Sequence, residues 1–164
     1  MAHFVDTESY EITDNVLVGS RPRFAEFTAD GSQLWVTSEV AGVVSVIDTK
    51  TRKIIKVIGF AVPGVQPEHI QPVGVRVAKD GSKAFVALGP ANRVAVVDAK
   101  TLEVEKYLLV GQRVWQLAFA PDEKQLFVTN GNSNDVSVID VPSLTVVKSI
   151  PVGSAPWGVA ISQH

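Results

Sequence analysis

The sequence predicts an all-β fold, a β-propeller made of four-stranded antiparallel meander blades, with about 3.5–4 blades in the chain. One fourteen-residue pattern occurs three times, as WVTSEVAGVVSVID from Trp35, FVALGPANRVAVVD from Phe85 and FVTNGNSNDVSVID from Phe127. The closing residues Asp48, Asp98 and Asp140 lie 50 and 42 residues apart. Asp-Gly turn signals separate short runs of alternating apolar residues. Repeats of about 40–45 residues that each hold several short strands are typical of propeller blades.

Each repeat contains four expected strands in one order. In the first unit they cover residues 24–28, 33–38, 43–48 and 53–58, and the two later units follow the same order. The first connection holds Asp30-Gly31 in one unit and Asp80-Gly81 in the next, and Asp-Gly between apolar runs favours a hairpin because glycine accepts positive φ. The pattern predicts about fourteen strands and almost no helix.

The repeat spacing divides the chain into five parts. They are the outer strands of an incomplete blade at 1–18, a blade at 19–60, a blade with an eight-residue insertion at 61–109, a blade at 110–151, and an inner strand of an incomplete blade at 152–164. The third strand of each unit is apolar on both faces, so a neighbouring sheet must cover each face. We therefore expect Val46, Ile47, Val96, Val97, Val138 and Ile139 to pack between blades. An open β-sandwich is the alternative, but it does not require such similar repeats.

Composition excludes several classes of function. The 15 basic and 17 acidic residues give a net charge of −2, which offers no basic surface for nucleic acid. The sequence has no cysteine, so disulfides, thiolate metal sites and cysteine nucleophiles are excluded. No apolar run reaches the roughly 18–20 residues needed to span a bilayer. The segment MAHFVDTESYE lacks a basic region followed by an apolar core, so we expect no signal peptide in this chain.

Several short segments carry a resemblance to a known family. The segments FVTN, VSVID and VGSAPWGVAI resemble the YVTN-type β-propeller repeat, and the likeness covers nearly the whole chain after residue 19. The segments QRVW and APWG make the chain similar to propeller proteins associated with PQQ-dependent alcohol catabolism in bacteria. This resemblance implies longer, exported parent proteins whose C-terminal half this chain would match. It therefore implies a periplasmic location.

The loops that lead into the inner strands hold the first candidate site. Alignment of the units places Arg21, Gln71, Arg113 and Ala155 at one position, and Arg23, Val73, Trp115 and Trp157 two residues later. Arg113 and Trp115 are candidates for binding an anionic or aromatic ligand, through a guanidinium fork and a stacking face. In the alternative interpretation, Trp115 and Trp157 fill gaps between blades and Arg113 holds a loop in place.

Two further positions interrupt the repeat. His69 stands beside the insertion AVPGVQPE, where it is either a metal or haem ligand or a loop residue without a role. Only three histidines occur, and His3 and His164 are near the termini, so no multi-histidine site is expected. Glu26 and Arg76 hold equivalent inner-strand positions, which predicts either an ion pair between blades or a polar contact in the central funnel.

No catalytic motif is present in the sequence, and we predict no cofactor and no metal. Two functions remain as hypotheses. The first is a non-catalytic scaffold or binding module, and the second is a propeller that handles a cofactor or haem for an oxidoreductase. We also expect two copies of the chain to close one ring as a homodimer.

Overall fold

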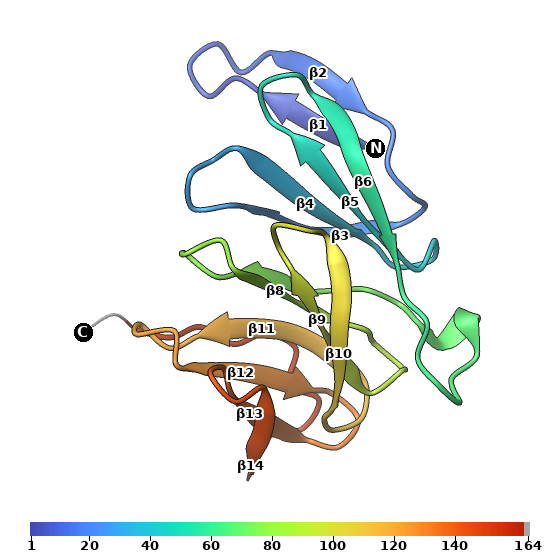
Figure 1. The fold of residues 1–164 in the computed structure, drawn as a ribbon, viewed down its shortest axis with the longest axis vertical. Coiled ribbons are helices and arrows are strands. Elements are labelled where there is room, and N and C mark those ends of the chain that lie inside the picture. The colour runs from blue at the N-terminus through green and yellow to red at the C-terminus, as the bar shows by residue number, and fades with distance from the viewer. Residues whose placement is uncertain (163–164) are drawn as a thin grey trace.

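Four antiparallel sheets stack side by side into an arc (Figure 1). The structure is a computed structural model that describes residues 1–162. Three sheets have four strands each and the N-terminal sheet has two. The prediction of an all-β propeller built from four-stranded meander blades is confirmed, as is the number of about fourteen strands.

The fourteen strands follow the repeat. The N-terminal sheet holds β1 (Ala2–Val5) and β2 (Ile12–Val16). Blade 1 holds β3 (Pro22–Phe27), β4 (Gln33–Ser38), β5 (Val43–Asp48) and β6 (Lys53–Gly59). Blade 2 holds β7 (Val75–Val77), β8 (Lys83–Ala87), β9 (Arg93–Asp98) and β10 (Glu103–Leu109), and blade 3 holds β11 (Val114–Phe119), β12 (Gln125–Asn130), β13 (Asp135–Asp140) and β14 (Thr145–Pro151). Strands follow one another in space in chain order within each sheet, as in a meander.

The third strands of the blades pack on both faces. Val46 lies in the apolar cluster between blades 1 and 2, whereas its neighbour Ile47 faces the N-terminal sheet. Val97 and Val96 repeat this division in blade 2, and Ile139 faces blade 2 from blade 3. These five residues have no exposed surface, so their predicted packing between blades is confirmed.

Val138 differs from the other five residues. It is buried, with 4% of its surface exposed, but it lies outside the clusters between blades because its face of blade 3 has no complete blade beside it. The aromatic residues that open the repeated pattern follow the same rule: Trp35 and Phe85 are fully buried, whereas Phe127 is only partly buried. The fourteen-residue pattern recurs because each copy presents the same apolar face toward the position of the next blade, which is filled beside blades 1 and 2.

The C-terminal segment differs from its prediction. We expected an inner strand at 152–164, but residues 152–162 form no strand, and residues 163–164 lie outside the described part. An inner strand needs hydrogen bonds from a second strand of its own blade, and no described segment supplies them. The segment nevertheless occupies the place of a fourth inner strand. The Thr129 hydroxyl donates to the Trp157 carbonyl at 3.0 Å, as the Thr37 hydroxyl donates to the Val73 carbonyl at 2.6 Å in blade 1.

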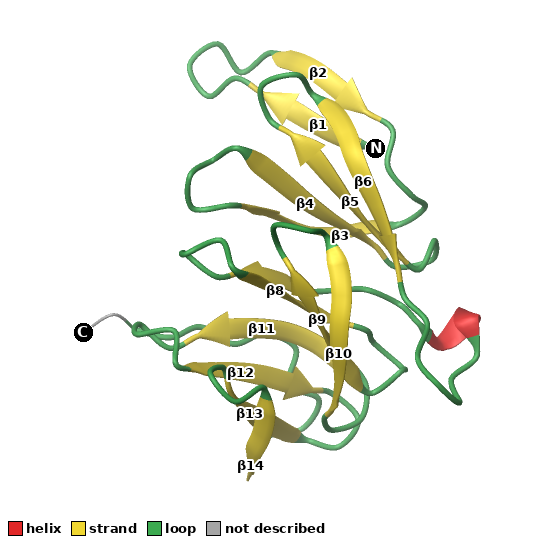
Figure 2. Cartoon of the chain, viewed as in Figure 1, coloured by secondary structure: helices red, strands yellow, loops and turns green. Residues whose placement is uncertain are grey.

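The insertion after blade 1 forms a packed loop. Val62 and Ile70 are buried in the cluster between blades 1 and 2. Between them lies the one helical segment of residues 1–162, the 3₁₀ turn η1 (Pro67–His69), which is drawn in red in Figure 2. No helix within the described residues is long and apolar enough to cross a membrane.

The aspartate that closes each repeat caps a turn. Asp48 accepts a hydrogen bond from the Thr51 amide at 2.6 Å, and Asp98 accepts one from the Thr101 amide at 2.8 Å. These bonds favour the carboxylate form, so the amide and hydroxyl of Thr51 lower the pKa of Asp48. At Asp30, the Thr28 hydroxyl and then the amide and hydroxyl of Ser32 lower the pKa to about 2. The closing aspartates are therefore explained by turn geometry.

These turns predict a loss of stability in acid. A carboxyl whose pKa is lower in the folded chain stabilises the fold above its unfolded value of 3.8, and this contribution is lost as the pH falls toward the folded value. We expect the melting temperature to fall between about pH 5 and pH 2. Asp30→Asn should flatten that fall in calorimetric scans, whereas Asp14→Asn is the matched control. Equal slopes for both variants would contradict the assignment.

Candidate functional site

A buried carboxylate at one end of the blades is surrounded by three arginines. Glu39 follows β4, and its side chain is only 3% exposed. Its Oε2 lies 3.0 Å from Nε of Arg21 and 3.5 Å from Nε of Arg23, and its Oε1 lies 3.6 Å from Nη2 of Arg113. Two arginines come from blade 1 and the third from the loop before β11, so the cluster links blade 1 to blade 3.

Tight turns before the inner strands position two of the arginines. Arg21 and Arg113 have φ of 56° and 58°, in the left-handed region that is uncommon for residues other than glycine. The amide of Glu39 donates to the Arg21 carbonyl at 2.9 Å, and the amide of Gly131 donates to the Arg113 carbonyl at the same distance. The turn is thus a repeated structure, and in blades 1 and 3 it presents an arginine at the same position.

Glu39 occupies a position that is glycine in the other repeats. Alignment places Glu39 with Gly89 and Gly131. In blade 3 the Trp115 indole packs directly on Gly131, where an added Cβ would collide with it. Blade 1 instead has Arg23 in the place of Trp115 and Glu39 in the place of the glycine. A structural pair of tryptophan on glycine is therefore replaced by a pair of opposite charges.

Two tryptophans border the arginines. The rings of Trp115 and Trp157 lie 4.3 Å apart between centroids, inclined at 37°. The Arg113 guanidinium lies 4.6 Å from the Trp115 ring centroid, and that of Arg23 lies 5.1 Å from the Trp157 centroid. These are cation–π distances. We use the name arginine–tryptophan cluster for Arg21, Arg23, Glu39, Arg113, Trp115 and Trp157.

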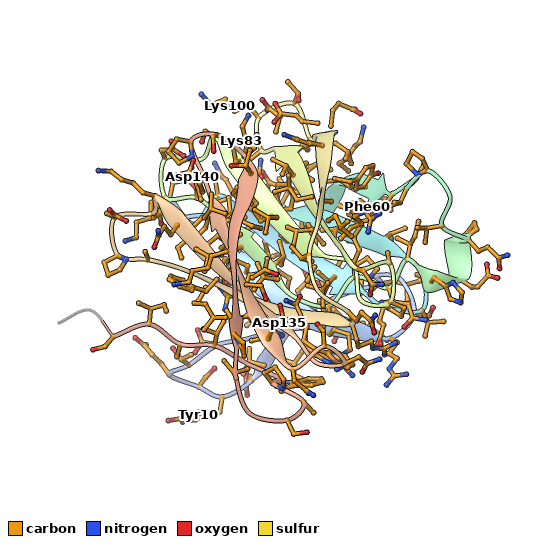
Figure 3. All side chains as sticks on the ribbon, turned by 90° about the horizontal axis from the view of Figure 1, so that it is seen from below. Tyr10, Phe60, Lys83, Lys100, Asp135 and Asp140 are labelled. Atoms are coloured by element: carbon orange, nitrogen blue, oxygen red, sulfur yellow. The ribbon has the colours of Figure 1, made fainter. Side chains whose placement is uncertain are left out.

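The cluster lies at the end of the blades opposite the aspartate turns. In Figure 3, Asp135 and Asp140 mark the two ends of β13, and Lys83 and Lys100 lie toward the Asp140 end. The loop after β4 that carries Glu39 corresponds to the loop after β12 that leads to Asp135. The cluster therefore belongs to the Asp135 end.

The other sequence candidates lie apart from this cluster. His69 is in the η1 turn, and no hydrogen bond to its ring and no group of three His, Cys, Asp or Glu able to hold a metal occurs among residues 1–162. Glu26 and Arg76 form the ion pair between blades that was one of the two expectations, with 3.5 Å between Oε2 and Nη1. Burial raises the pKa of Glu26, and the Arg76 charge partly offsets this. Both residues line a groove of about 360 Å³ beside the inner strands, so they also have the alternative, funnel-lining position.

Sequence reasoning identified Arg113 and Trp115 but missed Glu39 as their partner. The structure brings Arg113 and Trp115 together and adds Arg21, Arg23 and Trp157 to them. The available signal was the single glutamate at a position that is glycine in the other two units.

Residues 6–153 match the family described as Lactonase, 7-bladed beta-propeller. The chain belongs to this family. No curated protein matches it significantly. This member of the seven-bladed propeller lactonase family is similar to a solved chain of Kuenenia stuttgartiensis hydrazine synthase, with a TM-score of 0.79 and 25% identity over 87% of this chain and 39% of that one.

Two more distant structures share the fold alone. One is the WD40 repeats of RRP9, with a TM-score of 0.70 and 16% identity over 80% of this chain and 39% of that one. The other is a functionally unknown protein from Desulfotomaculum acetoxidans DSM 771, with a TM-score of 0.72 and 15% identity over 87% of this chain and 46% of that one. The chain thus spans less than half the length of these three solved propellers.

Proposed function

We propose that this chain is a non-catalytic binding module, one arc of a propeller ring that binds its ligand at the arginine–tryptophan cluster. The observation that carries the proposal is the convergence of Arg21, Arg23 and Arg113 on the buried carboxylate of Glu39. Side chains from two blades and from the C-terminal segment meet there. Polar side chains that converge from separate elements are a mark of ligand sites.

The chemistry of the cluster supports binding over catalysis. The carboxylate of Glu39 is enclosed, so it has no open approach for a water molecule or substrate proton. Neither Arg nor Trp is an ordinary proton-transfer group, and no histidine lies in the cluster. The link to PQQ-dependent alcohol oxidation and a periplasmic location rest on the sequence resemblance, and we retain both as part of the proposal.

The family is described as a lactonase, so an assay of lactone hydrolysis directly tests the proposal that the chain is non-catalytic. We expect the purified chain to hydrolyse no lactone above the buffer rate, because no positioned base and nucleophile accompany the arginines. A pH-stat assay with five- and six-membered lactones measures this. Turnover that disappears in Arg113→Gln or His69→Ala would refute the proposal.

Binding itself is testable without knowledge of the ligand. A mixed library of anionic, cationic and neutral aromatic compounds is screened by ligand-observed NMR against the chain. We expect ligands whose NMR signals the chain attenuates and whose intensity recovers with Trp157→Leu, since Trp157 is 52% exposed at the cluster. A library without hits, or with hits that Trp157→Leu leaves unchanged, would contradict a binding face at this place.

A propeller that handles a cofactor or haem is the second candidate. Its support is the position of His69 in the inserted loop, where a neutral imidazole can act as a ligand. An optical spectrum and metal analysis of the purified chain test it. Haem bands that disappear in His69→Ala would favour this candidate over the binding module.

We also propose that two copies close one ring. Among the described strands, β1 pairs only with β2, and β14, the outermost strand of blade 3, leaves Val146 and Val147 exposed. Uncovered edges and apolar faces favour association, and the segment at 152–162 holds the place of an inner strand without a partner. Light scattering is expected to give twice the chain mass of 17.6 kDa, and deletion of 157–164 should leave monomers. A full-length monomer at micromolar concentration would contradict the proposal.

A further inference from the structure

We infer that the arginine–tryptophan cluster binds a small organic oxyanion, a carboxylate or phosphate carried on a flat ring system. This inference names the ligand class for the binding function proposed above, and it rests on that function. It follows from three properties of the cluster: its charge balance, its free hydrogen-bond donors and its exposed indole.

The charge balance of the cluster is positive. Three guanidinium groups, which stay charged at any ordinary pH, surround the single carboxylate of Glu39. Within the described residues no other acidic side chain forms an ion pair with Arg21, Arg23 or Arg113. The cluster therefore has two positive charges without a paired anion. The whole chain carries a net charge of −2, so this excess is a local feature.

Most guanidinium N–H donors of the three arginines remain available for a ligand, although all three groups lie close to Glu39. Glu39 lies nearest to Nε of Arg21 and of Arg23, which leaves the Nη atoms of both groups for another partner. No side-chain hydrogen bond of ordinary geometry from these three guanidiniums is present among residues 1–162, and Oε2 of Glu39 accepts none. By contrast, Arg93 and Arg76 donate to backbone carbonyls. Guanidinium forks bind planar oxyanions through paired N–H donors.

Exposure identifies the side of approach. The Arg21 side chain is 60% exposed, whereas those of Arg23 and Arg113 are 21% and 28% exposed. A ligand therefore meets Arg21 first and reaches the Arg113 group at a partly desolvated position, where charge-assisted hydrogen bonds are stronger than in water. Glu39 holds the three like charges close together before any ligand arrives. Preorganisation of this kind reduces the entropy cost of binding.

The exposed indole favours a flat ligand over a simple inorganic anion. Trp157 is 52% exposed, and Trp115 supports it from one side at 4.3 Å between centroids. A ring that stacks on the free part of Trp157 places its anionic substituent within reach of Arg23, whose guanidinium lies 5.1 Å from that indole. A cationic ligand would meet the same indole but would be repelled by the arginines.

Four probes test the ligand class by isothermal titration calorimetry. They are 2-naphthoate, 2-naphthyl phosphate, the neutral 2-naphthamide and acetate. We expect one or both aromatic anions to bind at least tenfold more tightly than the amide and than acetate, with an affinity that falls as salt rises. The relative affinity of naphthoate and naphthyl phosphate decides between the two oxyanions. Equal binding of the amide would overturn the inference.

Variants assign the binding to the cluster. Arg21→Gln and Arg113→Gln are each expected to weaken the aromatic anion by tenfold or more, and Trp157→Leu is expected to reduce the aromatic anion toward the level of acetate. Lys100→Ala removes one positive charge at the opposite end of the blades and should leave affinity within twofold (Figure 3). Arg21 is the most exposed of the three arginines, so its variant is the safest against unfolding, and circular dichroism checks the fold of each.

The outcomes separate this inference from the proposed function. If the library screen gives only cationic or neutral aromatic ligands, and their binding is lost in Trp157→Leu, the binding module is supported and the oxyanion ligand class is refuted. Binding of 2-naphthoate that none of the cluster variants alters would refute the site. Absence of binding by all four probes at millimolar concentration would refute the ligand class, and a library without any hit would refute both proposals.

Discussion

Ile139→Asp is expected to lower the free energy of unfolding by about 4 kcal/mol or more. Ile139 has no exposed surface and lies in the cluster between blades 2 and 3 with Phe85 and Leu126. A carboxylate there loses its hydration and finds no positive partner, so burial of the charge is added to the loss of apolar contacts. Chemical denaturation followed by tryptophan fluorescence measures the change.

Two matched variants separate burial of charge from loss of packing. Ile139→Val removes one methylene and is expected to cost about 1 kcal/mol. Val138→Asp, on the opposite face of the same strand, should be destabilising by less than Ile139→Asp, since Val138 is 4% exposed and faces no complete blade. An unchanged denaturation midpoint for Ile139→Asp would contradict the placement of this residue between blades.

The repeated pattern predicts the fold because it records the packing of one blade on the next. Alternation in each strand predicts which face points to which neighbour, and the closing aspartates predict the turns. Trp35 and Phe85 open two of the patterns, and both are fully buried against the following blade. The segment at 157–162 has the same pattern but forms no strand. The pattern shows that a segment favours the strand conformation. The strand forms only when another segment of the same blade supplies its hydrogen bonds.

The candidate site could be predicted only in part, for a physical reason. Arg113 and Trp115 stand at two positions whose residues vary among the units, so a comparison of the repeats identifies them. Their link to Glu39 depends on how far the blades turn toward one another across the arc, which no strand pattern encodes. A lone glutamate in a loop is ordinarily solvated. Glu39 is buried because three arginines from two blades surround it, and that arrangement exists only in the folded chain.

Replacing Arg21, Arg23 and Arg113 together with Gln is expected to cost about 3 kcal/mol of stability, because a carboxylate that is 3% exposed would lose all of its partners. The single change at Arg21, whose side chain is 60% exposed, should cost about 1 kcal/mol or less.

If the loss of stability in the triple variant comes from the unpaired carboxylate, it should largely disappear when the carboxylate is also removed. In a chain that already carries Glu39→Gln, the same triple replacement is therefore expected to cost only about 1 kcal/mol, a coupling of about 2 kcal/mol. Urea denaturation of the four proteins in this cycle measures the coupling. Equal losses in the chain that keeps Glu39 and in the chain that carries Glu39→Gln would mean that the arginines stabilise the blades by packing on the indoles, and that Glu39 is not what holds them together.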